Sequence, residues 1–136
     1  MPTYNLFPDA EAIAGWKMRT VPLAGGRVYS SLPHTPIWPL ITLERIGGNP
    51  AERHYLDAPR IQVAVWGQSK SEAHDIAQQA RVTLHGLEGT TVTTGGGAPV
   101  NAFITGVEDD LGMFWSPDEV TGRDRYIFGV RLYLHG

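Results

Sequence analysis

The chain has 136 residues, a net charge of −3 and no cysteine. Its length supports one globular domain over residues 1–136, and the missing cysteines exclude a disulfide framework, a thiolate metal site and a cysteine nucleophile. Without a basic excess or an apolar run of roughly 20 residues, we expect no specific nucleic-acid partner and no membrane partner.

The N-terminal part of the sequence predicts a helix, a short strand and a proline-rich loop. Asp9 can cap a helix that extends to about Arg19. Pro22 and two glycines break the chain before a strand at residues 27–29. Residues 31–39 contain three prolines and predict an extended, ordered loop. We expect its apolar side chains to lie against the body of the fold; these are Leu32, Ile37 and Trp38.

The centre of the sequence predicts a hairpin of two strands. Residues 40–46 have the character of a strand with mixed faces. In residues 61–66 the apolar side chains alternate, which predicts a strand with two distinct faces. The polar segment 47–59 would form the long tip between them.

A capping box predicts the start of the second helix. Ser69 stands three residues before Glu72, so its hydroxyl can accept the amide of the third helical residue while the carboxylate reaches back to the cap amide. Small apolar residues continue at helical spacing, and we expect a helix over residues 69–85.

The C-terminal part predicts further strands separated by turns. Residues 88–99 are rich in threonine and glycine and predict a mobile loop. A strand is expected at residues 100–107, followed by an acidic turn at 108–110. Residues 113–115 are suited to another short strand, and residues 124–135 alternate regularly and predict the last one.

The predicted order of elements is therefore α-β-β-β-α-β-β. This order indicates an α+β domain, with a mostly antiparallel sheet and two helices packed on one face.

No residue pattern indicates catalysis or metal binding. The histidines form no H-x-x-H, H-x-x-x-H or H-E-x-x-H pattern, the glycine runs match no phosphate loop, and the serines lack the G-x-S-x-G elbow. Three consecutive carboxylates, Glu108, Asp109 and Asp110, could serve acid–base chemistry or hold a divalent cation, but they lack calcium-loop spacing. We expect no enzyme activity, no cofactor, no catalytic residue and no metal site.

The tryptophans leave two interpretations open. Trp66 alternates with Ile61, Val63 and Val65, so its ring points to the other face of the same strand. Either that face is covered by the chain itself, as part of a thick core, or the ring is exposed and indicates a protein partner.

Charged residues before the last strand are further candidates for an interface. Arg123, Asp124 and Arg125 predict a solvated turn, but in an oligomer they could pair with the acidic residues 108–110 of a neighbouring copy. The candidate residues for a subunit or tube interface are Trp66, Glu108, Asp109, Asp110, Arg123, Asp124 and Arg125.

Taken in order, these features resemble the tail terminator, or tail completion, family of long-tailed bacteriophages. The resemblance spans nearly the full chain. Its parts are the acidic first helix with residues 12–16, the strand at 26–29, the proline-rich stretch ending in 39–43, the glycines at 47 and 48, the strand-to-helix unit from Ile61 to Arg81, and the aromatic last strand at 125–130.

The resemblance implies a structural virion protein without catalysis. Such proteins form a hexameric ring on the finished tail tube, stop its polymerisation and offer the surface to which the head or its connector docks. The implied partners are further copies of the chain, the tail tube protein and a head–tail connector or neck protein. The implied location is the head-proximal end of the virion tail, after assembly in the host cytoplasm.

Long loops fit this role. The loops at 47–59 and 88–99 exceed simple connections, and we expect at least one of them to order only on contact with a neighbour or the tube.

Two alternatives remain from the sequence. The chain could be a neck or head-closure component, which would also be a small α+β ring subunit. It could instead be a small ligand-binding or enzymatic domain in which Trp38, Trp66 and Trp115 line a pocket. That last interpretation predicts polar groups with shifted pKa values that converge in a cavity.

Overall fold

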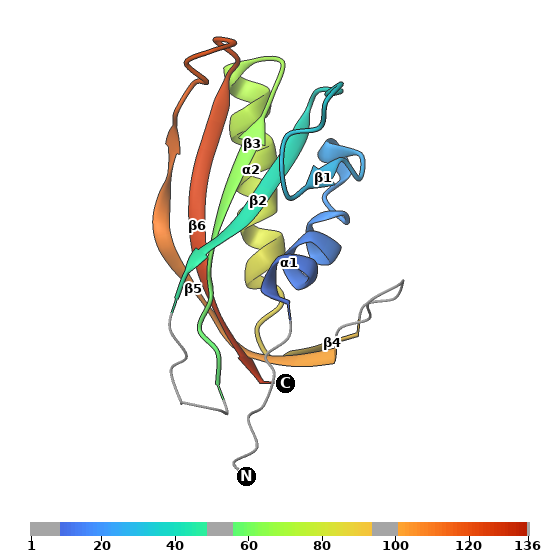
Figure 1. The fold of residues 1–136 in the computed structure, drawn as a ribbon, viewed down its shortest axis with the longest axis vertical. Coiled ribbons are helices and arrows are strands. Elements are labelled where there is room, and N and C mark those ends of the chain that lie inside the picture. The colour runs from blue at the N-terminus through green and yellow to red at the C-terminus, as the bar shows by residue number, and fades with distance from the viewer. Residues whose placement is uncertain (1–8, 49–55, 94–100, 136) are drawn as a thin grey trace.

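The computed structural model describes residues 9–48, 56–93 and 101–135. Two α-helices and a short 3₁₀ turn occur with six strands in the described ranges (Figure 1). The helical elements are α1 (Ala10–Met18), η1 (Pro22–Ala24) and α2 (Lys70–His85). The strands are β1 (Val28–Tyr29), β2 (Leu40–Gly47), β3 (Arg60–Trp66), β4 (Thr90–Thr93), β5 (Asn101–Trp115) and β6 (Arg125–His135).

The strands form one sheet in the order β1-β2-β3-β6-β5-β4. β1 runs parallel to β2, and every other neighbouring pair is antiparallel. The predicted hairpin is confirmed, since β2 and β3 pair from Leu40 opposite Trp66 to Gly47 opposite Arg60. Its tip, residues 49–55, lies outside the described residues. The α+β class with a mostly antiparallel sheet is confirmed.

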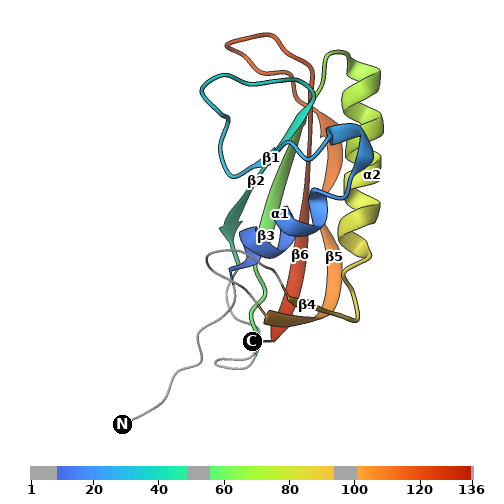
Figure 2. The same cartoon turned by 90° about the vertical axis from the view of Figure 1, so that its right-hand side faces the viewer.

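The core lies between the sheet and its two helices. Figure 2 shows α2 along one side of the sheet, while the chain between β1 and β2 lies on the other side. α2 buries a face made mostly of small residues, which lets the helix axis approach the strands closely. These residues are Ala73, Ile76, Ala77, Ala80 and Leu84. They pack with the alternating side chains of β3 and β6 that the sequence placed on one face, such as Val63 and Phe128.

Both helices begin at the predicted caps. The Asp9 carboxylate accepts the amide of Ala12, and the Ser69 hydroxyl accepts the amide of Glu72 at 3.1 Å. The returning carboxylate differs from the prediction: Glu72 Oε1 accepts the amide of Gln68 at 2.8 Å, one residue before the cap. The backbone of Ser69 is extended (φ −142°, ψ 164°), and the Glu72 carboxylate meets the amide of Gln68 instead of that of Ser69.

Two predictions about the C-terminal half are wrong. Part of the segment expected to be a mobile loop forms β4, whose residues pair with residues 101–104 of β5; residues 94–100 lie outside the described ranges. The residues expected to form an acidic turn, 108–110, lie inside β5, which continues to Trp115. β5 passes through this region because three shifts of register against β6 accommodate its extra residues.

The proline-rich segment matches its prediction only in part. Trp38 is half-buried against Trp66, with 5.8 Å between the ring centroids. Ile37 is 65% exposed, and Leu32 is exposed as well. The contact of Trp38 with Trp66 fixes the C-terminal end of the segment. Leu32 and Ile37 stay exposed to solvent.

Candidate interaction surfaces

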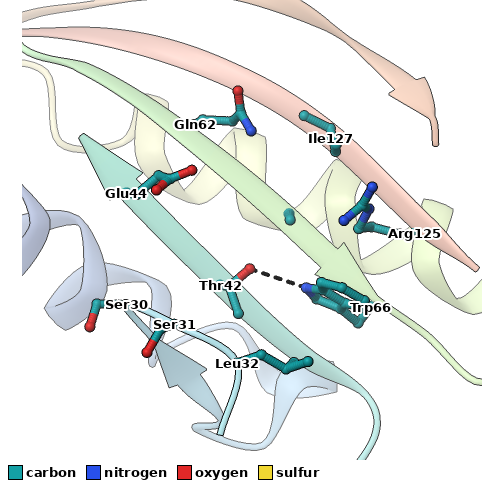
Figure 3. Close-up of a pocket in the computed structure, with 10 residues that line it drawn as sticks. Ser30, Ser31, Leu32, Thr42, Glu44, Gln62, Trp66, Arg125 and Ile127 are labelled. Atoms are coloured by element: carbon teal, nitrogen blue, oxygen red, sulfur yellow. Dashed lines mark hydrogen bonds between the residues drawn. The ribbon is translucent and has the colours of Figure 1, made fainter. Parts of the chain in front are cut away.

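Trp66 is covered by the chain itself. Its ring is 7% exposed, Trp38 packs over it, and its Nε1 donates to Thr42 Oγ1 at 3.1 Å (Figure 3). The second face of β3 is therefore covered at Trp66, as in the first of the two sequence interpretations, while Gln62 and Ala64 on the same face are half-buried. A role of Trp66 at an interface stays a prediction, and it would act through the segment that covers the ring.

Arg123, just before β6, and Arg125, its first residue, lie against this aromatic pair. The Arg123 guanidinium lies 4.2 Å from the ring centroid of Trp38, and that of Arg125 lies 4.9 Å from the ring centroid of Trp66. Arg125 Nε also donates to the Ser116 carbonyl at 2.9 Å. The neighbouring Asp124 accepts the indole N–H of Trp115 at 3.2 Å. These three residues follow an exposed turn and are themselves half-buried, because each contacts an aromatic ring of its own chain.

A small hollow lies beside Trp66 on the helix-free face (Figure 3). Its volume is about 260 Å³, below the roughly 300–1,000 Å³ of typical small-molecule pockets. The chain from Ser30 to Leu32 forms one wall, and side chains of β2, β3 and β6 form the floor. Trp115 lies elsewhere, with Lys70 Nζ 4.2 Å from its ring centroid. The three tryptophans of the ligand-binding alternative therefore do not line one pocket.

The three consecutive carboxylates point to alternate faces of β5. Asp109 accepts hydrogen bonds from Arg81 Nε at 3.0 Å and lies 2.8 Å from His85 Nε2, both on α2. Asp110 faces the other way and accepts from Arg60 Nε at 2.8 Å. Cations of the same chain thus already surround two of the residues that were expected to pair with a neighbouring copy. That pairing stays a prediction.

The electrostatics of this group follow its geometry. Hydrogen bonds from Arg81 and then His85 lower the pKa of Asp109 to about 2. The same carboxylate raises the pKa of Arg81. On the other face, hydrogen bonding to Glu108 raises the pKa of the Tyr133 phenol. The three acidic residues therefore bind partners within their own chain: Asp109 contacts α2, Asp110 contacts β3 and Glu108 contacts β6.

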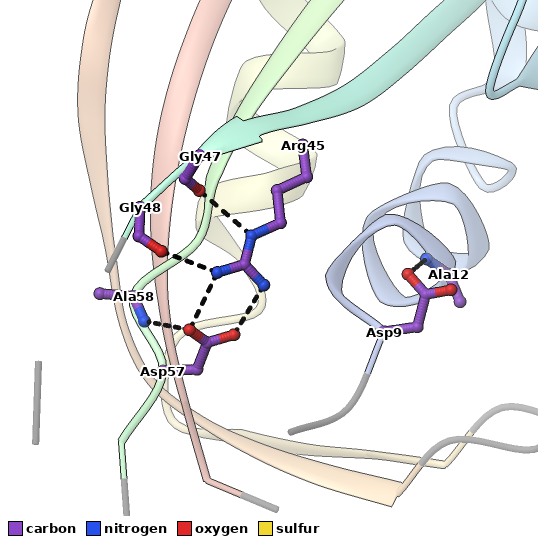
Figure 4. A network of polar contacts seen from close by, with 7 residues as sticks. All are labelled: Asp9, Ala12, Arg45, Gly47, Gly48, Asp57 and Ala58. Atoms are coloured by element: carbon purple, nitrogen blue, oxygen red, sulfur yellow. Dashed lines mark hydrogen bonds and ion pairs between the residues drawn. The ribbon is translucent and has the colours of Figure 1, made fainter. Parts of the chain in front are cut away.

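A buried ion pair, absent from the sequence expectations, joins the chain on either side of residues 49–55 (Figure 4). Asp57 is 1% exposed and accepts from both terminal nitrogens of Arg45, at 2.9 and 3.0 Å. Arg45 also donates to the carbonyls of Gly47 and Gly48. Gly48 has φ +96°, and a side chain there would collide with the Ala58 carbonyl. Sequence spacing gives no signal for this pair, because the two residues meet only through the turn between β2 and β3.

The described residues hold no group of three or more histidine, aspartate or glutamate side chains that could bind a metal ion. None of the helices in these ranges is long and apolar enough to cross a membrane.

Comparison with known proteins identifies the family. A sequence model described as "Tail completion protein gp17" matches residues 20–104. Among solved structures, a chain from "Virion of native gene transfer agent (GTA) particle" has a similar fold. Its TM-score is 0.64 at 16% identity, and the match covers 93% of this chain and 95% of that chain. A search of curated proteins gives no match. Since the family match spans more than half of the sequence, the chain belongs to the tail completion protein family of phage tail structural proteins.

Proposed function

We propose that this chain is a non-catalytic ring subunit that caps the finished tail tube at its head-proximal end. The ring, a hexamer, ends tube polymerisation and provides the surface to which the head or its connector attaches. Membership of the tail completion family over residues 20–104 is the observation that carries this proposal. The partners are other copies of the chain, the tail tube protein and the connector.

The two lateral sides of the molecule support a ring. A closed ring needs heterologous contacts, in which one side of a subunit meets a different side of the next. On one side lie β1 and β2, and on the other lies the long run of β5, while β4 and the start of β5 curve beneath α1 (Figure 1). The β5 side exposes Leu111, Phe114 and Trp115. We place the subunit interface along this side, so that it includes the candidates Glu108, Asp109 and Asp110 and the turn that carries Arg123, Asp124 and Arg125.

The first test is the mass of the protein in solution. Light scattering after size exclusion, over a range of concentrations, should show a species of about six times the 14.9 kDa of one chain. A second test adds the protein to polymerising tail tube protein. We expect shorter tubes whose ends carry a ring in electron micrographs.

The outcomes separate the alternatives. A monomer in solution that still caps tubes assembles on the tube. A ring that binds the connector but not the tube is a neck component. A monomer that leaves tube growth unchanged contradicts the proposal.

A further inference from the structure

The outer edge of β5 is open over most of its length. β4 pairs only with residues 101–104, and within the described ranges β5 has no partner other than β6 from residue 105 to Trp115 (Figure 1). Along this stretch Leu111, Phe114 and Trp115 are 39%, 43% and 45% exposed. A strand edge of this kind presents backbone groups that can pair with another extended segment.

One outward-facing amide of this edge already has a substitute partner. The Val107 amide donates to Glu88 Oε1 at 3.2 Å. Glu88 follows α2 and is exposed, so its carboxylate oxygen occupies the position of the carbonyl that an added strand would supply. An incoming strand can displace this side chain without disturbing the core.

β2, near the other edge of the sheet, already has partners. The Ile41 amide of β2 donates to the Arg27 carbonyl at 2.9 Å, and the Arg45 amide donates to Glu11 Oε1 of α1 at 2.8 Å. Joining β5 of one copy to β2 of the next would require both contacts to break. A segment from outside the sheet can pair with β5 and leave them intact.

The segment that fits is short. β5 shifts register against β6 between Ile104 and Gly106, between Asp109 and Leu111, and between Leu111 and Phe114. These bulges interrupt the ladder, so the regular run at residues 106–109 suits a strand of about five residues. Two copies of β5 paired along their full length would each meet the bulges of the other, which disfavours a two-fold dimer at this edge.

One segment of the sequence matches this requirement. Residues 3–7 read Thr-Tyr-Asn-Leu-Phe, with no glycine and no charge, between Pro2 and Pro8. Threonine and aromatic residues favour strands, and prolines at both ends limit the strand to five residues. Of the other segments outside the described ranges, 49–55 contains two charges and a proline, and 94–100 contains three glycines.

We propose that residues 3–7 of one copy add as a strand to the open edge of β5 in the neighbouring copy. α1 begins at Ala10 beside β1 and β2. In the sheet β3 and β6 lie between β2 and β5, although the start of β5 curves beneath α1 (Figure 1). In a head-to-tail ring the α1 side of one subunit adjoins the β5 side of the next. Eight residues span at most roughly 28 Å when extended, enough to cross such a contact.

This inference rests on the proposed ring, and its test measures the protection of the β5 amides themselves. Hydrogen exchange of peptides from residues 105–115 is measured by mass spectrometry at low and high protein concentration, with light scattering on the same samples. We expect exchange at these amides to slow by about tenfold or more at high concentration. Pairing within one chain would give protection that does not depend on concentration.

Two proline variants test for a strand ladder. In an added strand, alternate amides face the edge, so a proline removes a hydrogen bond at one position and none at the next. We expect only one of Asn5→Pro and Leu6→Pro to abolish the protection, while Asn5→Ala and Leu6→Ala control for the side chains. Both positions precede Asp9, the cap of α1, so neither change alters the described core.

Each result decides. Concentration-dependent protection that one proline removes supports the proposal. Protection that survives both prolines, or is lost with both, overturns it. If the protein forms a ring but its 105–115 amides are unprotected, the addition of residues 3–7 to β5 is wrong while the proposed ring function is unaffected. Absence of protection together with absence of any oligomer overturns this addition, and the tube-capping test then decides the function separately.

Discussion

At the scale of single residues, Asp109 connects β5 to α2 through charge. Its carboxylate binds Arg81 and His85, one turn apart on the same helix face. Their spacing of four residues places both side chains on one face of α2. The sequence does not predict their partner, because residue 109 was expected in a turn and only the continuous β5 brings it opposite the helix.

Asp109 should make stability depend on acid pH. Its pKa falls from the ordinary 3.8 to about 2 in the folded chain. A lowered pKa contributes stability above the unfolded value, and this contribution disappears as the pH falls from about 4 to about 2. The side chain is 45% exposed, so solvent screening limits its contribution to about 0.5–1 kcal/mol.

The variant Asp109→Asn tests this contribution. It should lower the free energy of unfolding at pH 7 by that amount and flatten the decline between pH 4 and pH 2, measured by urea denaturation at each pH. Glu119→Gln, at an exposed position in the turn before β6, is the control. If the free energy of unfolding falls equally between pH 4 and pH 2 in the Asp109→Asn variant and in the unsubstituted protein, Asp109 does not cause the decline.

The Arg45–Asp57 pair should be the most sensitive charged contact in the described chain. Asp57 is buried and takes two hydrogen bonds from Arg45 and one from the Ala58 amide. Asp57→Asn removes the charge at nearly constant shape, and we expect a loss of about 2 kcal/mol in chemical denaturation. The double variant Arg45→Met with Asp57→Asn should lose less than the sum of the single changes, because no unpaired charge remains. Strictly additive losses would show that the two side chains act independently.

At the scale of elements, β3 and α2 are the parts that the sequence predicts best. Regular alternation marks β3, and a capping box with helical spacing marks α2, so local pattern and tertiary packing agree there. β5 is harder to predict because its three register shifts break the alternation that identifies a strand. β4 is short, lies at an edge and adjoins a glycine-rich stretch, so its threonines resemble a loop.

The segment between β1 and β2 acts as a cover for the second face of the sheet. Trp38 is its anchor, packed on Trp66 and under Arg123, with Gln68 Nε2 bound to its carbonyl. The sequence predicts that apolar residues of this segment contact the fold. Which of them does so depends on the partner ring of β3 and the cations before β6, which only the folded sheet brings together.

Removing this anchor should expose Trp66. We expect Trp38→Ala to lower the free energy of unfolding by about 1–2 kcal/mol and to increase acrylamide quenching of the remaining tryptophan fluorescence. Ile37→Ala, at the neighbouring exposed position, should change stability by less than about 0.5 kcal/mol. Equal effects of the two variants would show that the segment is not anchored at Trp38.

At the scale of the whole molecule, the charges of the β5 side are largely bound within the chain. Asp109 and Asp110 contact Arg81 and Arg60, while Arg123 and Arg125 lie on tryptophan rings. A subunit contact built from ion pairs between copies would first have to break these contacts. A contact built from backbone pairing and the exposed apolar side chains of β5 would leave them intact.

The two kinds of contact respond differently to salt. Exposed ion pairs weaken as the Debye length shortens from about 10 Å at 0.1 M to about 3 Å at 1 M, whereas apolar burial does not. Because the acidic and basic groups of this side already have partners in their own chain, we expect the oligomer mass, measured by light scattering, to change little between 0.1 and 1 M sodium chloride. Dissociation at high salt would instead favour the pairing of residues 123–125 with the acidic residues 108–110 of a neighbour, and would place the main subunit contact in ion pairs rather than along the open edge of β5.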